Sequence, residues 1–493
     1  MKTVEPHPRR WGILAVLCLS LFVVVVDNTI LHVAVPSLLT ELDASTSDVQ
    51  WAIDAYSLVF AGLLLTAGSL GDRYGRRRAM ILGFGVFGAA SLLAAFAADP
   101  GQLIAARALM GVGGAFLMPG TLSIMAQVFA PEERTKAFAI WGTTSVVGVA
   151  AGPTLGGFLL EHFWWGSVFL VNVPVTLAAL AGLILLVPES RGPRRRPDVL
   201  GAILSTLGVS ALVWAVISGP GHGWTGIRTI GGLLVAAAAL AAFAWWQHAG
   251  RDPMLDLRLL TRPEFTGAAV MIALFSFAMA GTLFALTQLL QFVLGYGPLK
   301  AGLALLPLAG AAALGNGTGA ALDARLGSRN ALVIGFLTVA AGFALIGFTL
   351  DPGDGYGSIV TGLVVLGFGA GLGSPPAYGT LMNAVPSEEA GVASAVNDAG
   401  QELGNAFGVA VLGSVISAAY ARNLPADLPS GTLDATLTGS QAARDAFVQA
   451  VALGTLTAAA TTCAAAAFAA KILQPKKDHR SPHPEPTSSH TLR

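Results

Sequence analysis

Fourteen separate stretches of the chain are long, apolar and almost free of charge, and this repetition constrains the fold more than any other feature. A helix needs about 20 mainly apolar residues to cross the hydrocarbon layer of a bilayer. Only 11% of the residues are charged, whereas about 25% are charged in soluble proteins. The sequence therefore predicts an all-α polytopic membrane protein. The predicted spans are 11–36, 50–71, 79–97, 101–129, 136–160, 167–188, 198–218, 229–248, 265–292, 299–322, 330–349, 357–380, 390–419 and 446–471.

Basic residues are distributed unevenly between the two sides of the predicted membrane. With the N-terminus inside, 23 of the 28 lysines and arginines fall in cytoplasmic segments. The positive-inside rule and the even number of spans then predict that both termini are cytoplasmic. The first apolar run continues past signal-peptide length without a small-residue cleavage site, so it is predicted to be an uncleaved span.

Several classes of function lack their usual signals. The formal net charge is zero, so no broad basic surface favours nucleic acid, and the two cysteines, Cys18 and Cys463, lie near opposite ends of the chain. No GxxxxGK[ST] phosphate loop, HExxH metal motif or GxSxG nucleophile motif is present. We therefore expect neither a cofactor nor a metal. A membrane-embedded enzyme remains only as the least favoured alternative.

A glycine-rich stretch lies within the predicted fifth span, 136–160. It contains Gly148, Gly152, Pro153, Gly156 and Gly157. Relative to alanine, glycine costs about 1 kcal/mol and proline about 3 kcal/mol inside a helix. Small residues let helix backbones approach closely in membranes. This stretch is therefore predicted to form a tight, bendable helix contact and not a binding site.

A short pattern occurs twice, on cytoplasmic loops after the second and tenth predicted spans. Gly68, Asp72, Gly75 and Arg76 form the first copy, and Gly319, Asp323, Gly327 and Arg329 form the second. If spans seven and eight are an insertion, the copies follow the second helix of each of two six-helix halves, as in many secondary transporters. The predicted division is 1–188, an inserted pair at 189–250, a second half at 251–472 and a disordered tail at 473–493. A flexible external loop is predicted at about 420–445.

Motifs in these spans and loops occur in a known order. The loop GSLGDRYGRRR at 68–78 is followed by Gly148-x-x-x-Gly152-Pro153-x-x-Gly156-Gly157. Further matches lie at 27–36, 51–58, 103–115, 169–174, 295–307 and 401–404. Together they resemble the major facilitator superfamily, and within it the fourteen-span drug:proton antiporters that export quaternary ammonium compounds. His32 replaces a usual asparagine and Met110 a common glutamine.

The resemblance implies a fold and several roles. The expected fold is two six-helix bundles plus two additional helices. The glycine-rich fifth span becomes an antiporter signature. The cytoplasmic loop is expected to stabilise one access state through Gly68, Asp72, Arg73, Gly75 and Arg76.

Five ionisable residues lie inside predicted spans, where a charge is expensive and by default functional. They are Asp27, Asp54, Arg107, Asp398 and Glu402. The first three could meet at similar depth in the outer part of one half, whereas Glu402 lies near the midplane with Asp398 one turn below. Desolvation favours the protonated form of a carboxyl group, and a bound cation favours the charged form. Asp27, Glu402 and Asp54 are therefore predicted to couple protons to substrate.

Each of these residues also has a structural interpretation. Asp27 could bond Thr29 or His32, and Asp54 could lie at a wet rim. Arg107 could pair with Asp27 or with helix carbonyls. Asp398 could be solvated near the cytoplasm, and His32 could be either a proton relay or a neutral hydrogen-bonding residue.

Acids outnumber bases among the embedded residues, so the cavity should prefer cations. Aromatic and methionine side chains near it could supply apolar and cation–π contacts. The candidates are Tyr56, Met110, Met118, Phe284, Phe292 and Tyr378. The predicted substrate-binding set is Asp27, Asp54, Tyr56, Met110, Tyr378 and Glu402.

These observations predict a monomeric, proton-coupled antiporter that exports hydrophobic cationic drugs across the bacterial cytoplasmic membrane. Its expected partners are a small-molecule drug, protons and the lipid bilayer. Export of one endogenous metabolite or antibiotic is the nearest alternative, because the same motifs would serve it. Uptake by symport is a second alternative, which the fifth span disfavours by resemblance alone.

Overall fold

The computed structural model describes residues 7–42, 44, 46–192, 198–250, 253, 255, 257–351, 355–386, 390–424 and 440–473. The predicted tail after 473 and residues 425–439 of the predicted external loop lie outside the described residues. In the first part of the chain the α-helices are α1 (Arg10–Glu41), α2 (Thr46–Tyr74), α3 (Arg76–Ala95), α4 (Pro100–Val128), α5 (Pro131–His162), α6 (Ser167–Leu170), α7 (Asn172–Leu186), α8 (Val199–His222) and α9 (Ile227–Ala249). They continue with α10 (Pro263–Gln288), α11 (Pro298–Ala304), α12 (Leu306–Leu326), α13 (Ser328–Thr349), α14 (Gly357–Asn383), α15 (Ala390–Phe407), α16 (Gly413–Asn423) and α18 (Gln441–Ile472). A 3₁₀ turn, η1 (Leu257–Thr261), and two π-helical segments, η2 (Leu289–Val293) and η4 (Gly408–Leu412), complete the described helices.

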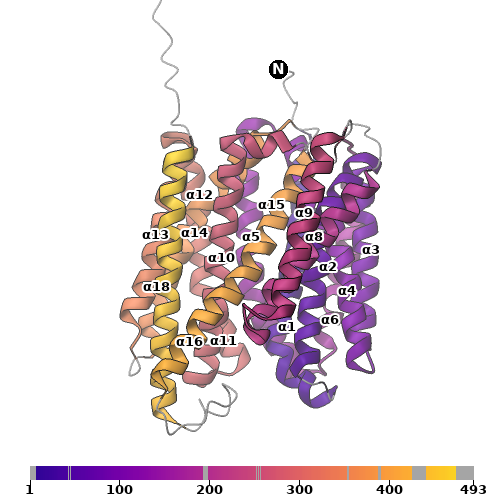
Figure 1. Cartoon of the computed structure of the whole chain (residues 1–493). Coiled ribbons are helices and arrows are strands. Elements are labelled where there is room, and N and C mark those ends of the chain that lie inside the picture. Colours follow the sequence, from indigo (N-terminus) through magenta and orange to yellow (C-terminus); the bar gives the residue numbers. More distant parts are fainter. Residues whose placement is uncertain are drawn as a thin grey trace, which may run out of the picture.

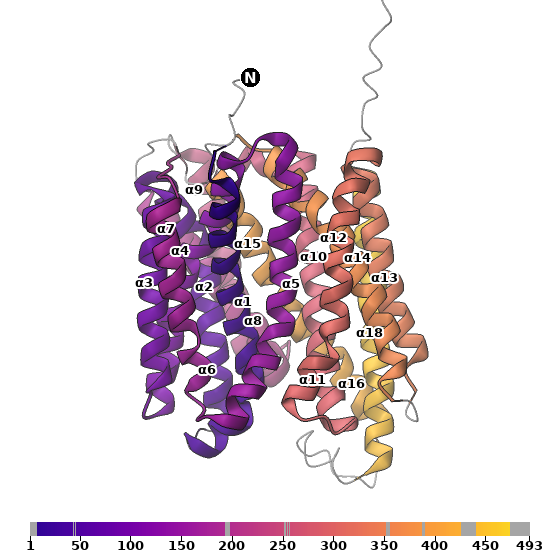
Figure 2. The ribbon, with the colours of Figure 1, turned by 180° about the vertical axis from the view of Figure 1, so that it is seen from behind.

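The prediction of an all-α protein with fourteen spans is confirmed, since fourteen helical segments in the described chain are long and apolar enough to cross a membrane. Their ends differ from the predicted ones by a few residues. For example, α1 continues through Pro36 to Glu41. The start of α1 and the end of α18 lie at the same end of the bundle (Figures 1 and 2).

The helices form two groups that stand side by side (Figure 1). In the first group α2 and α3 pack on α4, and α1 packs on α5. In the second, α13 packs on α14 and α18, α12 packs on α14, and α10 packs on α18 and α15. α8 and α9 pair with each other, and α8 lies against α2. On the opposite side, α5 contacts α11, α12 and α14 of the second group (Figure 2). The proposed boundaries between halves and insertion stay predictions.

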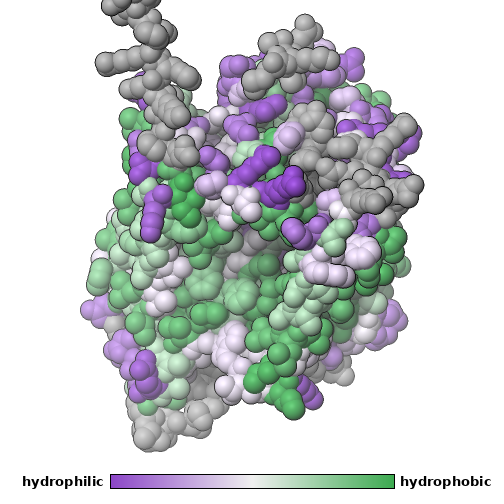
Figure 3. Space-filling view, turned by 45° about the horizontal axis from the view of Figure 1, so that its top comes forward, coloured by the Kyte–Doolittle hydropathy of each residue, from purple (hydrophilic) through white to green (hydrophobic). Residues whose placement is uncertain are grey.

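The surface agrees with a membrane environment. In the view of Figure 3, hydrophobic residues cover the middle of the molecule, and hydrophilic residues gather toward its two ends. Large apolar side chains such as Leu185 and Phe348 are more than 70% exposed on the outside of the bundle. Such exposure is costly in water and expected in lipid.

The glycine-rich stretch of α5 lies against two different helices. A Cβ built on Gly148 would come within 2.9 Å of Val25 Cγ1, and one on Gly152 would overlap Thr29 Oγ1, so this face of α5 contacts α1. On another face, a Cβ on Gly157 would lie 2.7 Å from the backbone nitrogen of Leu299. Pro153 is accommodated inside the helix. The absence of side chains therefore allows α5 to approach α1 in its own group and the helices near α11 in the other.

Candidate functional site

A buried ion pair joins α1 and α4. Nη1 of Arg107 donates to Oδ2 of Asp27, and the two side chains are 1% and 0% exposed. Nε of Arg107 also donates to the carbonyl oxygen of Ala52 on α2, at 3.1 Å. Both partners that the sequence suggested for Arg107, the Asp27 carboxylate and a helix carbonyl, are therefore used together. Removing one charge of such a pair leaves the other buried and uncompensated.

Two further polar residues complete the surroundings of Asp27. Asn172 at the start of α7 donates from Nδ2 to Oδ1 of Asp27 at 2.8 Å and lies 3.1 Å from Ser91 Oγ on α3. Ser91 Oγ in turn donates to the carbonyl oxygen of Phe169 at 2.8 Å. Asn172 and Ser91 are 1% and 0% exposed. Side chains from α1, α3, α4 and α7 thus form one buried polar network, with backbone carbonyls of α2 and α6 as further acceptors. The sequence alone did not assign Asn172 and Ser91 to this network.

Tyr56 lies beneath the Arg107 guanidinium. The guanidinium carbon is 4.4 Å from the centroid of the Tyr56 ring, and the ring stacks on Phe60 with centroids 5.5 Å apart. Tyr56 is fully buried. The Sδ atom of Met110 is 3.9 Å from Arg107 Nη1. Tyr56 and Met110, which were both expected to line the substrate cavity, therefore both contact Arg107.

Asp54 does not join this network. It is partly exposed, and no hydrogen bond or ion pair to its carboxylate is found within the described part of the chain. Asp54 and Tyr56 are two residues apart on α2 and so point to nearly opposite sides of the helix. Of Asp27, Asp54 and Arg107, which were expected to meet at similar depth, only Asp27 and Arg107 are in contact in the described structure.

A second group of acids lies on α15. Asp398 is 3% exposed and accepts from Asn397 Nδ2 at 3.1 Å and from Ser394 Oγ at 3.4 Å. The alternative in which Asp398 is merely solvated is therefore wrong. Glu402, one turn further along, is partly buried, and it is close enough to interact electrostatically with both Asp398 and Tyr56.

Aromatic side chains from α5 and α14 flank these acids. Tyr378 donates to Oε1 of Gln401 at 3.3 Å, and its ring meets that of Trp141 edge-on with centroids 5.1 Å apart. Trp141 is 2% exposed, and its Nε1 has no hydrogen-bond acceptor among the described residues. Trp141 and Gln401 were not predicted as site residues, because neither is ionisable or part of a charged pattern.

The remaining cavity candidates do not gather at one place. Met118 is 8% exposed within α4, and Phe284 is 40% exposed on α10. The side chains of His32 and Phe292 lie outside the described part of the structure. Among the described residues, no three His, Cys, Asp or Glu side chains form a group that could hold a metal ion.

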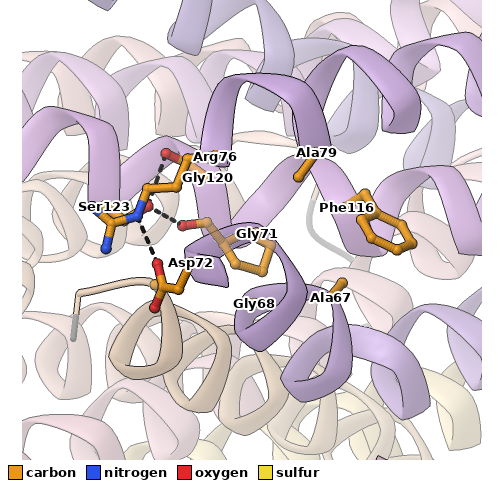
Figure 4. Close-up of a pocket in the computed structure, with 11 residues that line it drawn as sticks. Ala67, Gly68, Gly71, Asp72, Arg76, Ala79, Phe116, Gly120 and Ser123 are labelled. Carbon is orange, nitrogen blue, oxygen red and sulfur yellow. Dashed lines mark hydrogen bonds and ion pairs between the residues drawn. The ribbon is translucent and has the colours of Figure 1, made fainter. Parts of the chain in front are cut away.

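A small pocket lies at the end of α2, where α3, α4 and α15 meet (Figure 4). Asp72 and Arg76 face each other there in a buried ion pair of 2.7 Å. A Cβ on Gly391, in the first turn of α15, would overlap the Asp72 carboxylate, and one on Gly68 would lie 2.8 Å from the Cβ of Ala395. We call these four residues, Gly68, Asp72, Gly391 and Ala395, the α2–α15 latch.

The rest of the loop is fixed by the segment after α7. Gly75 has φ 121°, a conformation that favours glycine. The Glu189 carboxylate lies over Gly75 and accepts from the backbone N–H of Arg77 at 3.2 Å. Arg73 stacks on Tyr74, with its guanidinium carbon 5.2 Å from the ring centroid. These contacts hold the loop in position beside α15.

The second copy of the loop pattern is used differently. Asp323 accepts from Ser328 Oγ at 2.7 Å, and Arg329 donates from Nε to the carbonyl oxygen of Ala470 at 2.9 Å. Both contacts stay within the second group of helices. Of the two aspartates, only Asp72 therefore joins the two groups in the described structure, because it lies against Gly391 of α15.

Comparison with known proteins agrees with this geometry. The model of the Major Facilitator Superfamily matches residues 17–409. The multidrug efflux pump LfrA of Mycolicibacterium smegmatis is 38% identical over 87% of this chain and 85% of its own length. The methyl viologen resistance protein SmvA of Salmonella typhimurium is 35% identical over 86% of this chain and 85% of its own. The tetracenomycin C resistance and export protein of Streptomyces glaucescens is 31% identical over 98% and 95%.

The fold also matches a solved structure. The human organic anion transporter MFSD10 (TETRAN) superposes with a TM-score of 0.64 over 92% of this chain and all of that one, at 16% sequence identity. That likeness concerns the arrangement of helices alone. Taken with the family model and the relatives that align along most of their length, it shows that this chain is a multi-pass membrane protein that belongs to the major facilitator superfamily.

Proposed function

We propose that this protein is a proton-coupled antiporter that exports hydrophobic cationic drugs from the cytoplasm. The observation that carries the proposal is the buried Asp27–Arg107 pair, whose neighbour Tyr56 is also within electrostatic range of Glu402 on α15. The names of LfrA and SmvA, a multidrug efflux pump and a methyl viologen resistance protein, support this class of substrate.

Proton binding at Asp27 changes the balance of charge in the first group of helices. When a proton binds Oδ2, the carboxyl group loses its charge and the guanidinium of Arg107 loses its counterion. A buried unpaired charge costs several kcal/mol, about 3–5 in measured cases. The protonated and charged forms of Asp27 therefore favour different arrangements of α1 against α4, so proton binding changes how these two helices pack.

The charge pattern favours a cationic substrate. The embedded base, Arg107, is already paired with Asp27, so Asp54, Asp398 and Glu402 are left without an opposite charge in the described spans. A cation that enters near Glu402 stabilises its carboxylate form and displaces a proton, whereas proton binding expels the cation. Mutually exclusive binding of a proton and a cation at Glu402 supplies one part of antiport, and protonation of Asp27 supplies the change in helix packing.

Alternating access would follow from movement of the two groups of helices about this site. The α2–α15 latch closes one end, which we assign to the cytoplasm because the basic loops lie there. The contact of Gly157 with Leu299 closes the other end beside α5. We assign the protein to the bacterial cytoplasmic membrane as a monomer, with no cofactor and no enzymatic reaction.

The decisive experiment is transport in proteoliposomes with an imposed pH gradient, using methyl viologen as a cationic probe. Asp27→Asn should abolish pH-driven exchange while the protein still inserts and remains folded. Asp99→Asn is the matched control, because Asp99 is an exposed N-cap of α4 and asparagine caps helices equally well. Undiminished proton-driven exchange in Asp27→Asn would refute the proposal.

A dedicated exporter of one antibiotic is the second candidate. It is supported by the relative named for tetracenomycin C resistance and export, which aligns with 98% of this chain. A panel of cationic, neutral and anionic compounds in the same assay separates the two. Exchange of several unrelated cations supports multidrug export, whereas exchange of a single compound supports the dedicated exporter.

A further inference from the structure

We infer that Tyr56 is a positioning residue that stabilises Arg107 through its aromatic ring, and that it is not a ligand of the transported cation. The inference rests on the proposed function in one respect, namely that Asp27 is a proton-binding site. It differs from the sequence-based expectation, in which Tyr56 lines the substrate cavity. The arguments come from how α2 and α4 pack.

Two glycines of α4 bring Tyr56 beneath the guanidinium. Gly111 and Gly114 follow Arg107 by four and seven residues and so lie on the same face of α4. A Cβ on Gly111 would approach the backbone nitrogen of Phe60 to 3.2 Å, and one on Gly114 would lie 2.8 Å from the Tyr56 hydroxyl oxygen. Only residues without side chains allow α2 to lie this close to α4.

The ring of Tyr56 is held on both faces. Arg107 lies over one face at 4.4 Å from the centroid, and Phe60 stacks with the ring at an interplanar angle of 16°. Tyr56 is 0% exposed, and its hydroxyl has no hydrogen-bond partner in the described structure. A transported cation therefore has no free ring face to bind, and the hydroxyl makes no contact that would require tyrosine over phenylalanine.

The ring affects the two protonation states of Asp27 unequally. An aromatic face carries negative potential, which attracts the guanidinium and repels a nearby carboxylate. While Asp27 is charged, the two effects oppose each other. Once Asp27 is protonated, only the attraction remains, and it is strongest in a desolvated site. The ring therefore lowers the cost of leaving Arg107 without its counterion, and it favours proton uptake.

The charged groups around this ring come from three other elements besides α2. Asp27 on α1 and Glu402 on α15 are the acids within electrostatic range, and Arg107 on α4 is the base. Asp54 lies on α2 itself, on the opposite side of the helix. Of these groups, Arg107 is the one in direct contact with the ring face.

The test replaces Tyr56 by phenylalanine and then by phenylalanines carrying increasing numbers of ring fluorines. Fluorine withdraws charge from the ring face with little change of size, so packing is retained. Exchange of methyl viologen for protons is followed in proteoliposomes as a function of pH. The same series at Phe60 is the matched control, because Phe60 stacks on Tyr56 and not on Arg107.

We expect plain phenylalanine at position 56 to behave as tyrosine does. Successive fluorines should move the pH midpoint of exchange to lower pH, by about one unit at full fluorination, a tenfold change in proton concentration. The KM for methyl viologen should stay constant, and the Phe60 series should not move the midpoint. A rise in KM with a constant midpoint would show that Tyr56 binds the cation, and no change in either would show that the ring has neither role.

The same assay separates failure of the proposed function from failure of the inference about Tyr56. If Asp27→Asn retains the full pH dependence in this assay, Asp27 is not the proton site, whatever the fluorinated series gives. If Asp27→Asn loses it and the fluorinated series has no effect, only the role of Tyr56 is wrong.

Discussion

Asn172 donates a hydrogen bond of 2.8 Å to the Asp27 oxygen that Arg107 does not take, so α7 completes the coordination of an acid on α1. The amide also lies 3.1 Å from Ser91 Oγ. Asp27 is therefore held by a cation on one oxygen and a neutral donor on the other.

Asn172→Ala should weaken the charged form of Asp27. A hydrogen bond to a charged group contributes about 1.5–3 kcal/mol, so we expect a loss of stability of that order. The pH midpoint of exchange should move upward by about one unit or more, because the proton then competes with a less stabilised carboxylate. Thermal unfolding and the pH profile in proteoliposomes measure the two effects.

Ser91→Ala is the control for this prediction. It removes a neighbour of the Asn172 amide but leaves the bond from Asn172 to Asp27 in place. Its midpoint should move less than that of Asn172→Ala. An unchanged midpoint in Asn172→Ala would mean that Asp27 does not exchange protons during transport.

Gly152→Ala should disturb the contact of α5 with α1. The new Cβ would overlap Thr29 Oγ1 and lie 2.8 Å from Thr29 Cβ, and it would also lie close to the backbone of α1. Overpacking typically costs about 1–3 kcal/mol. We expect a lower unfolding temperature and slower exchange. Gly85→Ala on α3 is the control, because no atom lies within 4 Å of its Cβ position, and equal effects of the two substitutions would exclude close packing as the cause.

Asp72→Asn should weaken the α2–α15 latch while keeping the shape of the side chain, and it also removes the ion pair of Asp72 with Arg76. The Asp72 carboxylate lies over Gly391 in the first turn of α15, where negative charge is favourable by about 0.3–1 kcal/mol and up to about 2 when partly buried. Hydrogen exchange of backbone amides at 390–395 should accelerate several-fold, and transport should slow. Asp323→Asn is the matched control from the second copy of the motif, since its bond to Ser328 lies within one group of helices. Equal acceleration in both variants would argue against the latch.

The sequence predicted the spans because each needs only local composition, and it offered Asp27 as one possible partner of Arg107 because depth can be counted along a helix. It did not predict which side chains of each helix face the neighbouring helices. Tyr56 was expected in the cavity, yet Gly111 and Gly114 turn it against Arg107. Rotation and tilt of a membrane helix depend on packing, which a hydropathy pattern does not contain.

The sequence also did not identify the neutral polar residues of the site. Asn172 lies in the stretch 169–174 that supported the family resemblance, but a single asparagine has no cost in a span comparable with that of a charge. Its role became visible only when α7 was placed beside α1 and α3. The burial of Asp398 likewise depends on Asn397 and Ser394, whose side chains supply the hydrogen bonds that water would otherwise make.

Cross-links between helices can show which elements move together. A Cβ on Gly62 of α2 would lie 3.5 Å from the Cβ of Ser210 on α8, and one on Gly142 of α5 would lie 3.6 Å from the Cβ of Ser374 on α14. Both distances suit a disulfide, for which Cβ atoms are about 3.5–4.5 Å apart. The two cysteine pairs can therefore be compared directly after Cys18 and Cys463 have been replaced by serine.

We expect opposite outcomes for the two pairs. α8 is bonded to α2 by Ser210 to the Leu58 carbonyl and by Thr206 to Thr66, so it should move with α2. An oxidised Gly62→Cys/Ser210→Cys pair should then leave exchange nearly unchanged. An oxidised Gly142→Cys/Ser374→Cys pair joins the two groups of helices and should stop exchange until a reductant restores it. Reversible inhibition by the first pair would show that α8 shifts against α2 in each cycle, and full activity of the second would exclude relative movement of α5 and α14.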